Sequence, residues 1–350
     1  MNSPSVNMTA EFSHQLIHWQ QQHGRHDLPW QNNRDPYRVW LSEIMLQQTQ
    51  VSTVIPYYRR FLQRFPDVAH LAIATQDDVL QNWSGLGYYS RARNLHAAAQ
   101  RILCDFNGRF PEDQTSLMTL PGIGRSTAAA ILAFCFAQRA AILDGNVKRV
   151  LTRQFGISGY TGERQVETTL WRLAEKLLPE KQVSTYTQAL MDLGALVCTR
   201  HRPQCNACPV AQSCVAKQTH QVAGLPTPKP KRVVPEQSRY LVSYLCEDKV
   251  YLTQRPATGI WAKLWCLPDY AAPLNLELEC VKLFGVPPQE RRENRPFRHT
   301  LTHRHLDITP VWVKLSAHYP SPDGQWVTQE QALTMGIPVP VRKILQMAQN

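Results

Sequence analysis

The chain has 350 residues, a formal net charge of +11 at pH 7 and a pI of about 9.3. This length exceeds one ordinary domain and fits two or three, and a hydrophobic fraction of 43% is enough to build their cores. The basic balance favours a polyanionic partner, nucleic acid before an anionic membrane surface, although a basic enzyme without such a partner has the same composition.

The N-terminus has no basic start followed by an apolar run, and no stretch approaches the roughly 20 apolar residues of a membrane helix. Neither a secreted nor a membrane-spanning protein is therefore indicated, and we expect a cytoplasmic chain that keeps its thiols reduced. Nine cysteines in that compartment do not predict a disulfide framework.

The hydrophobic pattern is helical from about residue 10 to residue 216. Phe12, Leu16 and Trp19 recur at helical spacing, and the next helix begins with Asp35 as N-cap and Pro36 at its first position. No strand pattern interrupts this half, so we expect it to be all-α. Further helices are predicted over residues 51–65, 77–85, 89–106, 126–137, 146–156, 163–178 and 183–198.

Residues 217–238 are rich in Pro and Lys and predict an extended linker. Beyond them the pattern alternates, which indicates a small α+β domain with Glu247-Asp248 as a hairpin turn and a final helix over residues 340–350. Strands are predicted over residues 239–246, 249–255, 305–315 and 325–327.

Four of the nine cysteines form a C-x6-C-x2-C-x5-C array made of Cys198, Cys205, Cys208 and Cys214. A structural zinc site usually pairs two separated CxxC units or adds histidines, whereas a cubic [4Fe-4S] cluster takes one thiolate on each iron. The single loop favours the cluster and leaves zinc as the alternative. Basic residues that could offset a cluster's negative charge or touch phosphate flank the array: Arg200, His201, Arg202 and Lys217.

The stretch "SLMTLPGIGRSTAAAIL" predicts two helices joined by a hairpin that contains Gly122 and Gly124. Glycines let the backbone turn sharply and approach a ligand, and the second helix then offers unpaired N–H groups to a phosphate. This helix–hairpin–helix grips DNA backbone without reading sequence. The alternative is a plain corner between two helices.

Asp144 follows in "AILDGNVKRVL", directly before another helix. Taken alone, it is an N-cap aspartate. The order of hairpin, aspartate and four-cysteine loop resembles the endonuclease III superfamily of DNA glycosylases, in particular its adenine-specific MutY branch. The resemblance covers nearly the whole chain and rests on these stretches: "LPWQNNRDPYRVWLSEIMLQQTQV", "GLGYYSRARNLH", "LPGIGRSTAAAI", "LDGNVKRVL", the cysteine loop and the C-terminal half.

The resemblance implies a multidomain fold: an all-α helix-hairpin-helix glycosylase core, made of a six-helix domain and a [4Fe-4S] domain, followed by an α+β Nudix-like domain. We expect the six-helix domain at 24–136, the cluster domain at 1–23 with 137–216, the linker at 217–238 and the Nudix-like domain at 239–350. The four cysteines are then the ligands of one [4Fe-4S] cluster.

The same resemblance assigns the chemistry to Glu43, Asp144 and Asn146. Glu43 is the expected general acid, and its apolar helical neighbours should raise its pKa so that it can protonate adenine N7. Asp144 is expected to support an oxocarbenium-like sugar, either as its electrostatic partner or as a covalent nucleophile, with Asn146 as a supporting amide. Without the family pattern, Glu43 would be an ordinary solvated helix glutamate.

Ser126 occupies the position at which the bifunctional endonuclease III branch has a lysine. A serine cannot form a Schiff base with the sugar, so we expect a monofunctional glycosylase that leaves the strand intact.

Contacts to the lesion are expected from two stretches of the helical half and one of the C-terminal domain. A flipped-out base leaves a gap that side chains must fill. For Tyr88, a core aromatic is as good an interpretation as a wedge. The residues that match the family's wedge and opposite-base contacts are Leu46, Gln47, Gln48, Thr49, Leu86 and Tyr88.

In the C-terminal domain, Leu301-Thr302-His303 replaces the family's usual Phe-Ser-His loop. The hydroxyl of Thr302 can still meet 8-oxoguanine, whereas Leu301 loses an aromatic face; His303 is kept. No Arg-Glu-x-x-Glu-Glu run is present, so no pyrophosphatase activity is expected.

The predicted substrate is double-stranded DNA with A:8-oxoG or A:G mismatches. A downstream abasic-site endonuclease is the expected partner, and we expect a monomeric, nucleoid-associated enzyme without membrane contact. Two alternatives remain: an oxidised-pyrimidine or thymine glycosylase of the same superfamily, and a non-catalytic, redox-sensing DNA-binding protein.

Overall fold

The computed structural model describes residues 6–31, 33–230, 233–271, 275–321 and 323–347, with backbone only for residues 6–9. Its contacts divide the chain into two units: residues 1–58, 67–72 and 97–231 form the first, and residues 59–66, 73–96 and 232–350 form the second. Among the described residues, no helix combines the length and the apolar character needed to cross a membrane.

The described residues between 6 and 230 fold into helices, which confirms the all-α expectation; their only β contact is an isolated bridge between Tyr160 and Thr227. A π-helical turn, Leu193–Val197, extends α11, and a 3₁₀ turn covers Cys205–Ala207. The helices are α1 Val6–His23, α2 Pro36–Leu46, α3 Val51–Arg64, α4 Val68–Ile73, α5 Gln76–Trp83, α6 Ser90–Asp105, α7 Gln114–Thr119, α8 Arg125–Cys135, α9 Gly145–Phe155, α10 Arg164–Lys176, α11 Val183–Asp192 and α12 Val215–Gln218.

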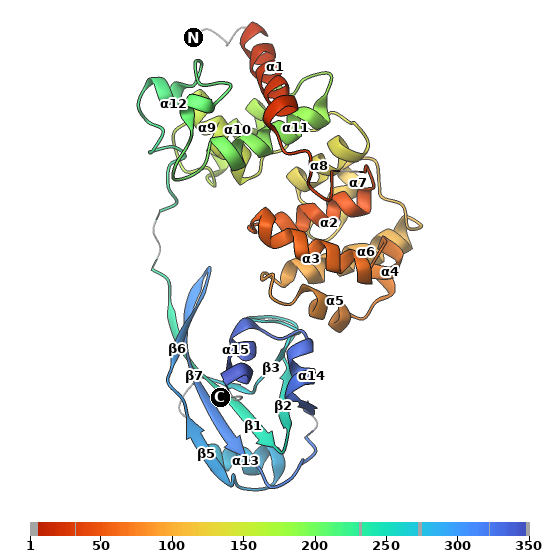
Figure 1. Cartoon of the computed structure of the whole chain (residues 1–350), viewed down its shortest axis with the longest axis vertical. Coiled ribbons are helices and arrows are strands. Elements are labelled where there is room, and N and C mark those ends of the chain that lie inside the picture. The colour runs from red at the N-terminus through yellow and green to blue at the C-terminus, as the bar shows by residue number, and fades with distance from the viewer. Residues whose placement is uncertain (1–5, 32, 231–232, 272–274, 322, 348–350) are drawn as a thin grey trace. The chain divides into compact units, whose positions relative to one another are not determined.

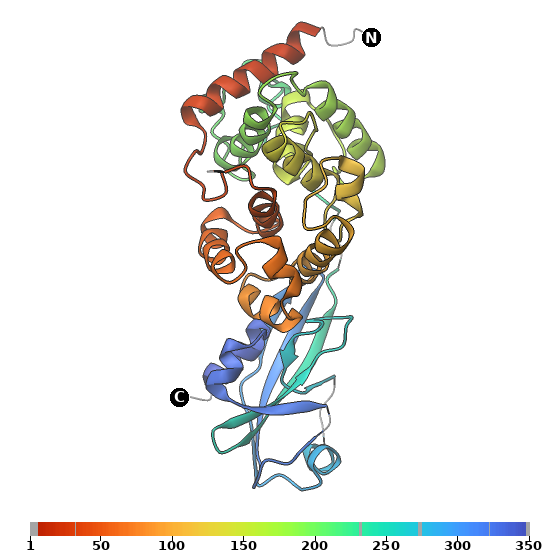
Figure 2. The same cartoon turned by 90° about the vertical axis from the view of Figure 1, so that its right-hand side faces the viewer.

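Capping residues determine where α2, the helix that carries Glu43, begins. Asp35 accepts a hydrogen bond from the Tyr37 N–H at 2.9 Å and starts α2, and Pro36 follows it as predicted. α1 lies along α11 although about 160 residues separate them, as the red and green helices of Figures 1 and 2 show. The chain therefore returns to its own N-terminal helix before it enters the cysteine loop.

The segment 217–238 is not extended throughout, which corrects part of the linker expectation. α12 occupies its start, Leu225 is buried, and the Gly159 N–H donates to Thr227 Oγ1 at 3.1 Å. Residues 217–227 thus pack on the helices of the first unit, because their apolar and hydroxyl side chains find partners there that a Pro/Lys composition does not reveal.

In the second unit, residues 236–328 form an eight-stranded mixed sheet in which β1 and β7 pair in parallel and the other pairs are antiparallel. Cys246 pairs with Lys249, so Glu247-Asp248 is the predicted hairpin turn. The elements are β1 Glu236–Cys246, β2 Lys249–Gln254, β3 Trp265–Cys266, β4 Asp269–Tyr270, α13 Leu276–Phe284, β5 Glu290–Glu293, β6 Phe297–Leu301, β7 Arg304–Lys314, β8 Gly324–Thr328, α14 Gln329–Thr334 and α15 Val339–Met347.

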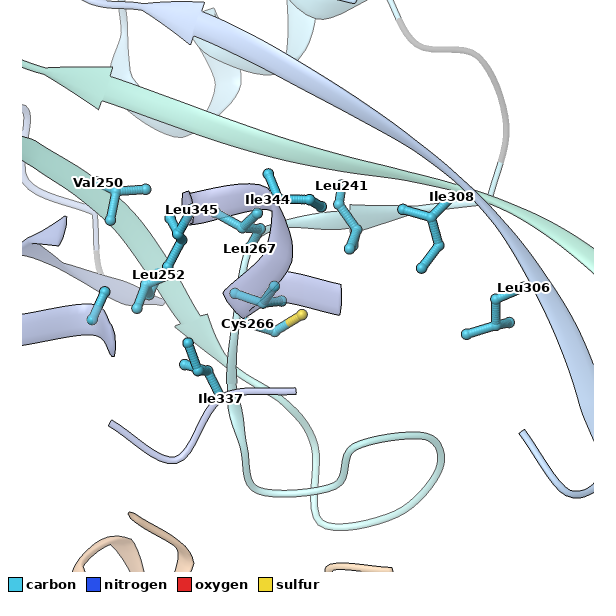
Figure 3. Close-up of a cluster of buried hydrophobic side chains, with 12 residues drawn as sticks. Leu241, Val250, Leu252, Cys266, Leu267, Leu306, Ile308, Ile337, Ile344 and Leu345 are labelled. Carbon is cyan, nitrogen blue, oxygen red and sulfur yellow. The ribbon is translucent and has the colours of Figure 1, made fainter. Parts of the chain in front are cut away.

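Helices cover both faces of this sheet. One core gathers inward-facing residues of β1, β2, β3 and β7 with Ile344 and Leu345 of α15 (Figure 3), and the other gathers the alternate strand residues with Phe284 of α13. This alternation is the period-2 pattern that predicted the long strands. β5 and β6 were not predicted, because the sequence of β5, Glu-Arg-Arg-Glu, is fully exposed and carries no alternation of apolar residues.

Candidate functional site

A pocket of about 450 Å³ in the first unit is lined by Glu43 of α2. Walls come from the loop after α1, from α2 and from α11, three segments that are far apart in sequence. Apolar side chains line it together with amide, hydroxyl and charged ones, among them Arg25 and Arg34, a mixture that is usual in small-molecule pockets. Its lining includes Leu28, Trp30, Gln31, Val39, Ser42, Leu46, Val51, Phe134, Ser184 and Gln188.

Glu43 carries a strongly perturbed carboxyl group. Burial first, and the negative charge of Asp144 second, raise its pKa to about 8. Val39 and Leu46, predicted as its apolar neighbours, line the same pocket, and Trp40 is fully buried behind it. At neutral pH Glu43 is therefore mostly a protonated acid.

Asp144 is the N-cap of α9: its Oδ1 accepts from the Val147 N–H at 2.8 Å. Burial raises the pKa of its carboxyl, while hydrogen bonds from the backbone of Val147 and from Asn146, together with the charge of Arg149, oppose that rise. Asp144 can cap α9 and still interact electrostatically with Glu43, because the cap uses one carboxylate oxygen and leaves the second available.

Asn146 is the second residue of α9 and is held by Arg149, which donates to its Oδ1 at 2.8 Å and to the Gly194 carbonyl. Arg149 also donates to the carbonyl of Cys198 at 2.7 Å. The side chain of Asn146 thus has a fixed orientation beside Asp144.

The hairpin between α7 and α8 has the predicted form. Gly122 has φ +79°, a left-handed conformation that favours glycine, and Gly124 is the N-cap of α8 with open space where a Cβ would lie. The Ser126 hydroxyl accepts from the Leu143 N–H at 3.1 Å, so Ser126 ties α8 to the segment that ends at Asp144.

The four cysteines of the loop after α11 line one small cavity with Arg153 and Lys217. Among the described residues, no three of the possible ligands His, Cys, Asp or Glu converge as they would on a single ion. Four thiols around one shared space provide the number of ligands that a four-iron cluster takes, one thiolate on each iron.

Gln47, Gln48 and Thr49 follow α2 directly. Gln47 is its C-cap, and Gln48 is exposed with φ +57°. The Thr49 hydroxyl donates to the Gln47 carbonyl at 3.4 Å. These three residues form a tight turn that presents amide side chains, and Leu46 before them lines the pocket of Glu43.

In the second unit, Tyr88 and Thr302 meet: their hydroxyls share a hydrogen bond of 3.1 Å. Tyr88 is 45% exposed and has φ +47°, whereas Leu86 is only 6% exposed. Of these two candidate wedges, only Tyr88 therefore presents its side chain to solvent. His303 lies beside Thr302, and both line a pocket of about 400 Å³ with Trp261.

Sequence reasoning missed the side chains that complete the pocket of Glu43. Arg25 donates through its backbone N–H and through Nε to Asp192, a fully buried carboxylate, and Gln188 donates to the same carboxylate at 2.9 Å. Gln31 donates to the Arg25 carbonyl. In the sequence, only the "LPW" of the stretch that resembles the family indicated that the loop after α1 contributes to the site. Nothing in the sequence predicted that this loop contacts α11.

Comparison with known proteins agrees with this geometry. The model of the HhH-GPD superfamily of base excision DNA repair proteins matches residues 41–176, and a NUDIX domain model matches residues 239–347. An adenine DNA glycosylase from Buchnera aphidicola subsp. Baizongia pistaciae is 37% identical over 341 residues, which cover 96% of each chain.

Two solved structures resemble the helical part. A thermostable thymine-DNA glycosylase superposes with a TM-score of 0.57 and 28% identity, over 62% of this chain and all of that one. A non-covalent complex of endonuclease III with DNA gives a TM-score of 0.53 at 20% identity, over 62% of this chain and 99% of that one, which shows the shared fold alone.

Proposed function

Because the chain belongs to the adenine DNA glycosylase family, a branch of the HhH-GPD base excision repair proteins, we propose that it excises adenine mispaired with 8-oxoguanine or guanine from double-stranded DNA. The observation that carries this proposal is the carboxyl of Glu43, which lines a pocket and whose pKa is raised to about 8 by burial and by the charge of Asp144. Two acidic groups in different protonation states are what acid-assisted cleavage of a glycosidic bond requires.

In the proposed reaction, protonated Glu43 donates its proton to N7 of adenine. The C1′–N9 bond then breaks, its electron pair leaves with the base, and positive charge develops on the sugar. Asp144 stabilises this charge, with Asn146 as its supporting amide, and water adds to C1′ while losing a proton. The products are free adenine and an abasic site.

The absence of an amine nucleophile at residue 126 supports a monofunctional reaction. The hydroxyl of Ser126 is engaged with the backbone of Leu143, and serine forms no imine. An abasic strand left intact would need a separate endonuclease, which remains the expected partner.

DNA binding is proposed for the hairpin of Gly122 and Gly124, where the N-terminus of α8 would receive a phosphate. Tyr88, Thr302 and His303 are proposed to contact the base opposite adenine; their exposure and the shared hydrogen bond of Tyr88 with Thr302 support this role. No pyrophosphatase chemistry is proposed for α13, which carries only Glu277 and Glu279 as acidic residues.

The four cysteines are proposed to hold one [4Fe-4S] cluster, which would stabilise the loop after α11 and supply one-electron redox chemistry. The cavity that they share is the supporting observation. A brown protein with about four irons and matching sulfide would agree with this ligand set, whereas stoichiometric zinc would contradict it.

The substrate is tested by single-turnover kinetics on four duplexes that carry A:8-oxoG, A:G, T:G or thymine glycol. Fast release of adenine from the first two is expected. Preferential release of thymine from T:G would favour the second candidate, a thymine glycosylase. We retain this candidate because the chain is 28% identical to the thymine-DNA glycosylase structure. A borohydride-trapped imine at one lysine would contradict the monofunctional assignment.

A further inference from the structure

Arg153, in the last turn of α9, is an almost completely buried cation. Its Nε donates to the Leu225 carbonyl at 2.8 Å, its Nη1 to the Thr199 carbonyl at 2.7 Å, and its Nη2 to the Arg200 carbonyl at 3.2 Å. Nη1 also donates to the sulfur of Cys198 at 3.4 Å. Three of these acceptors are neutral, and only the sulfur can carry a full negative charge.

In the described part of the chain, no carboxylate forms an ion pair with Arg153. Burying a guanidinium without an opposite charge is costly, since carbonyl oxygens replace only part of its hydration. Other cations add to the excess: Lys217 lines the same cavity, and Arg149 donates to the Cys198 carbonyl. An anion bound in the cavity that the four cysteines line would compensate this excess of positive charge.

Arg153 also fastens both ends of the cysteine loop. Its side chain donates to the Cys198 sulfur at the start, and its backbone carbonyl oxygen lies 3.5 Å from the Cys214 sulfur at the end. The neighbouring Gln154 donates to the Ser213 hydroxyl at 2.8 Å. One turn of α9 therefore determines the spacing between the first and the last candidate ligand.

We propose that Arg153 is the buried counter-charge of the cluster and a positioning residue for it: it sets the reduction potential through its charge and the hydrogen bond to Cys198. The inference rests on the [4Fe-4S] cluster proposed above. Four thiolates outweigh the charge of the iron–sulfide core, so the loaded site is an anion that compensates Arg153. Net charge and hydrogen bonds to the sulfurs are established determinants of cluster potential.

The test compares three variants of the full-length protein: Arg153→Gln, Arg153→Lys and Lys217→Gln. Lys217→Gln is the matched control, because it removes one positive charge from the same cavity at an exposed position. We measure the one-electron reduction potential by voltammetry, and the rate at which iron is lost to a chelator.

Arg153→Gln should lower the potential, since loss of a nearby buried cation favours the more oxidised cluster. A tenfold rise in the oxidised-to-reduced ratio at fixed electrode potential is expected, which is 59 mV for a one-electron couple. Lys217→Gln should change that ratio less than twofold, because water screens an exposed charge. Arg153→Lys should keep the potential but lose iron several-fold faster, because lysine has no planar fork of donors.

The proposal is overturned if the oxidised-to-reduced ratio of Arg153→Gln at fixed electrode potential lies within twofold of the parent's ratio. It is also overturned if Arg153→Gln and Lys217→Gln have the same reduction potential. If Arg153→Gln assembles no cluster, Arg153→Lys decides: assembly with the parent potential supports the charge role, and failure of both variants contradicts it. Iron and sulfide counts on the parent protein separate this result from failure of the cluster assignment, and adenine release tests the enzymatic function independently.

Discussion

The candidate residues of the two units differ in how far their side chains are exposed to solvent. In the first unit, Arg153 is buried, Glu43 and Asp144 are half-buried, and burial raises the pKa of both carboxyls, so the properties of these groups depend on the few groups packed around them. In the second unit, Tyr88 and Thr302 are exposed, and their hydroxyls share a hydrogen bond. Bond cleavage needs shifted protonation states that burial supplies, whereas reading a base edge needs donors and acceptors that DNA can reach.

This contrast predicts the largest loss for Glu43→Gln. The amide keeps the shape of the side chain but has no acidic proton, so single-turnover excision of adenine should fall by about 10²–10⁴-fold. DNA affinity should stay within a few fold of the parent. Excision within tenfold of the parent would remove Glu43 from the role of general acid.

Asp144→Asn should reduce excision by about 10²–10³-fold, since it removes the charge that faces the sugar. The variant remains a good helix cap, so the thermal midpoint should hardly change. Binding of an A:8-oxoG duplex, followed by fluorescence anisotropy, should be retained. If folding is lost together with activity, capping and not chemistry is the dominant role of Asp144.

The pH dependence of kcat/KM in the unmutated protein tests the proposed role of Glu43 in the first unit. In the proposed reaction Glu43 is protonated and Asp144 is ionised, so kcat/KM should fall about tenfold per pH unit above the Glu43 pKa of about 8. It should also fall in acid, where Asp144, whose pKa burial raises, takes up a proton. The profile of Glu43→Gln should lack this alkaline limb. A limb that persists in the variant would belong to another group.

In the second unit, smaller effects are expected from Thr302→Val, which removes the hydroxyl but keeps the shape. One hydrogen bond contributes about 0.5–1.5 kcal/mol, so the preference for A:8-oxoG over A:G should fall by roughly 2–12-fold. The turnover of A:G should not change. Thr302→Ser, the matched control, should restore the preference; equal losses in both rates would indicate a structural role.

The hairpin glycines give the smallest effects on chemistry. Gly122→Ala places a Cβ at φ +79° and should cost about 1–2 kcal/mol of unfolding free energy. Gly124→Ala meets open space and should leave stability unchanged but weaken DNA binding, because its methyl group would lie where a phosphate approaches. Denaturant titration and anisotropy on undamaged duplex distinguish the two; equal stability of both variants would contradict the turn argument.

Much of this protein was predictable from short segments. Asp35 and Pro36 begin α2, paired glycines form the hairpin, Asp144 caps α9, and alternating residues form β1, β2 and β7. These features depend on neighbours within a few residues, where capping, φ preferences and periodicity act. The family pattern added the hypothesis that Glu43 is the general acid, but it did not describe the surroundings of that side chain.

Only the tertiary structure decided the environments of the charged groups. Asp144 raises the pKa of Glu43, Asp192 holds Arg25 and Gln188, and Arg153 reaches both ends of the cysteine loop. Desolvation and Coulomb interactions depend on distances between segments about 100 residues or more apart in several of these pairs, and no local pattern records such distances. The sequence by itself therefore determined which elements and which kinds of side chain are present, and the packing of distant segments determined what those side chains can do.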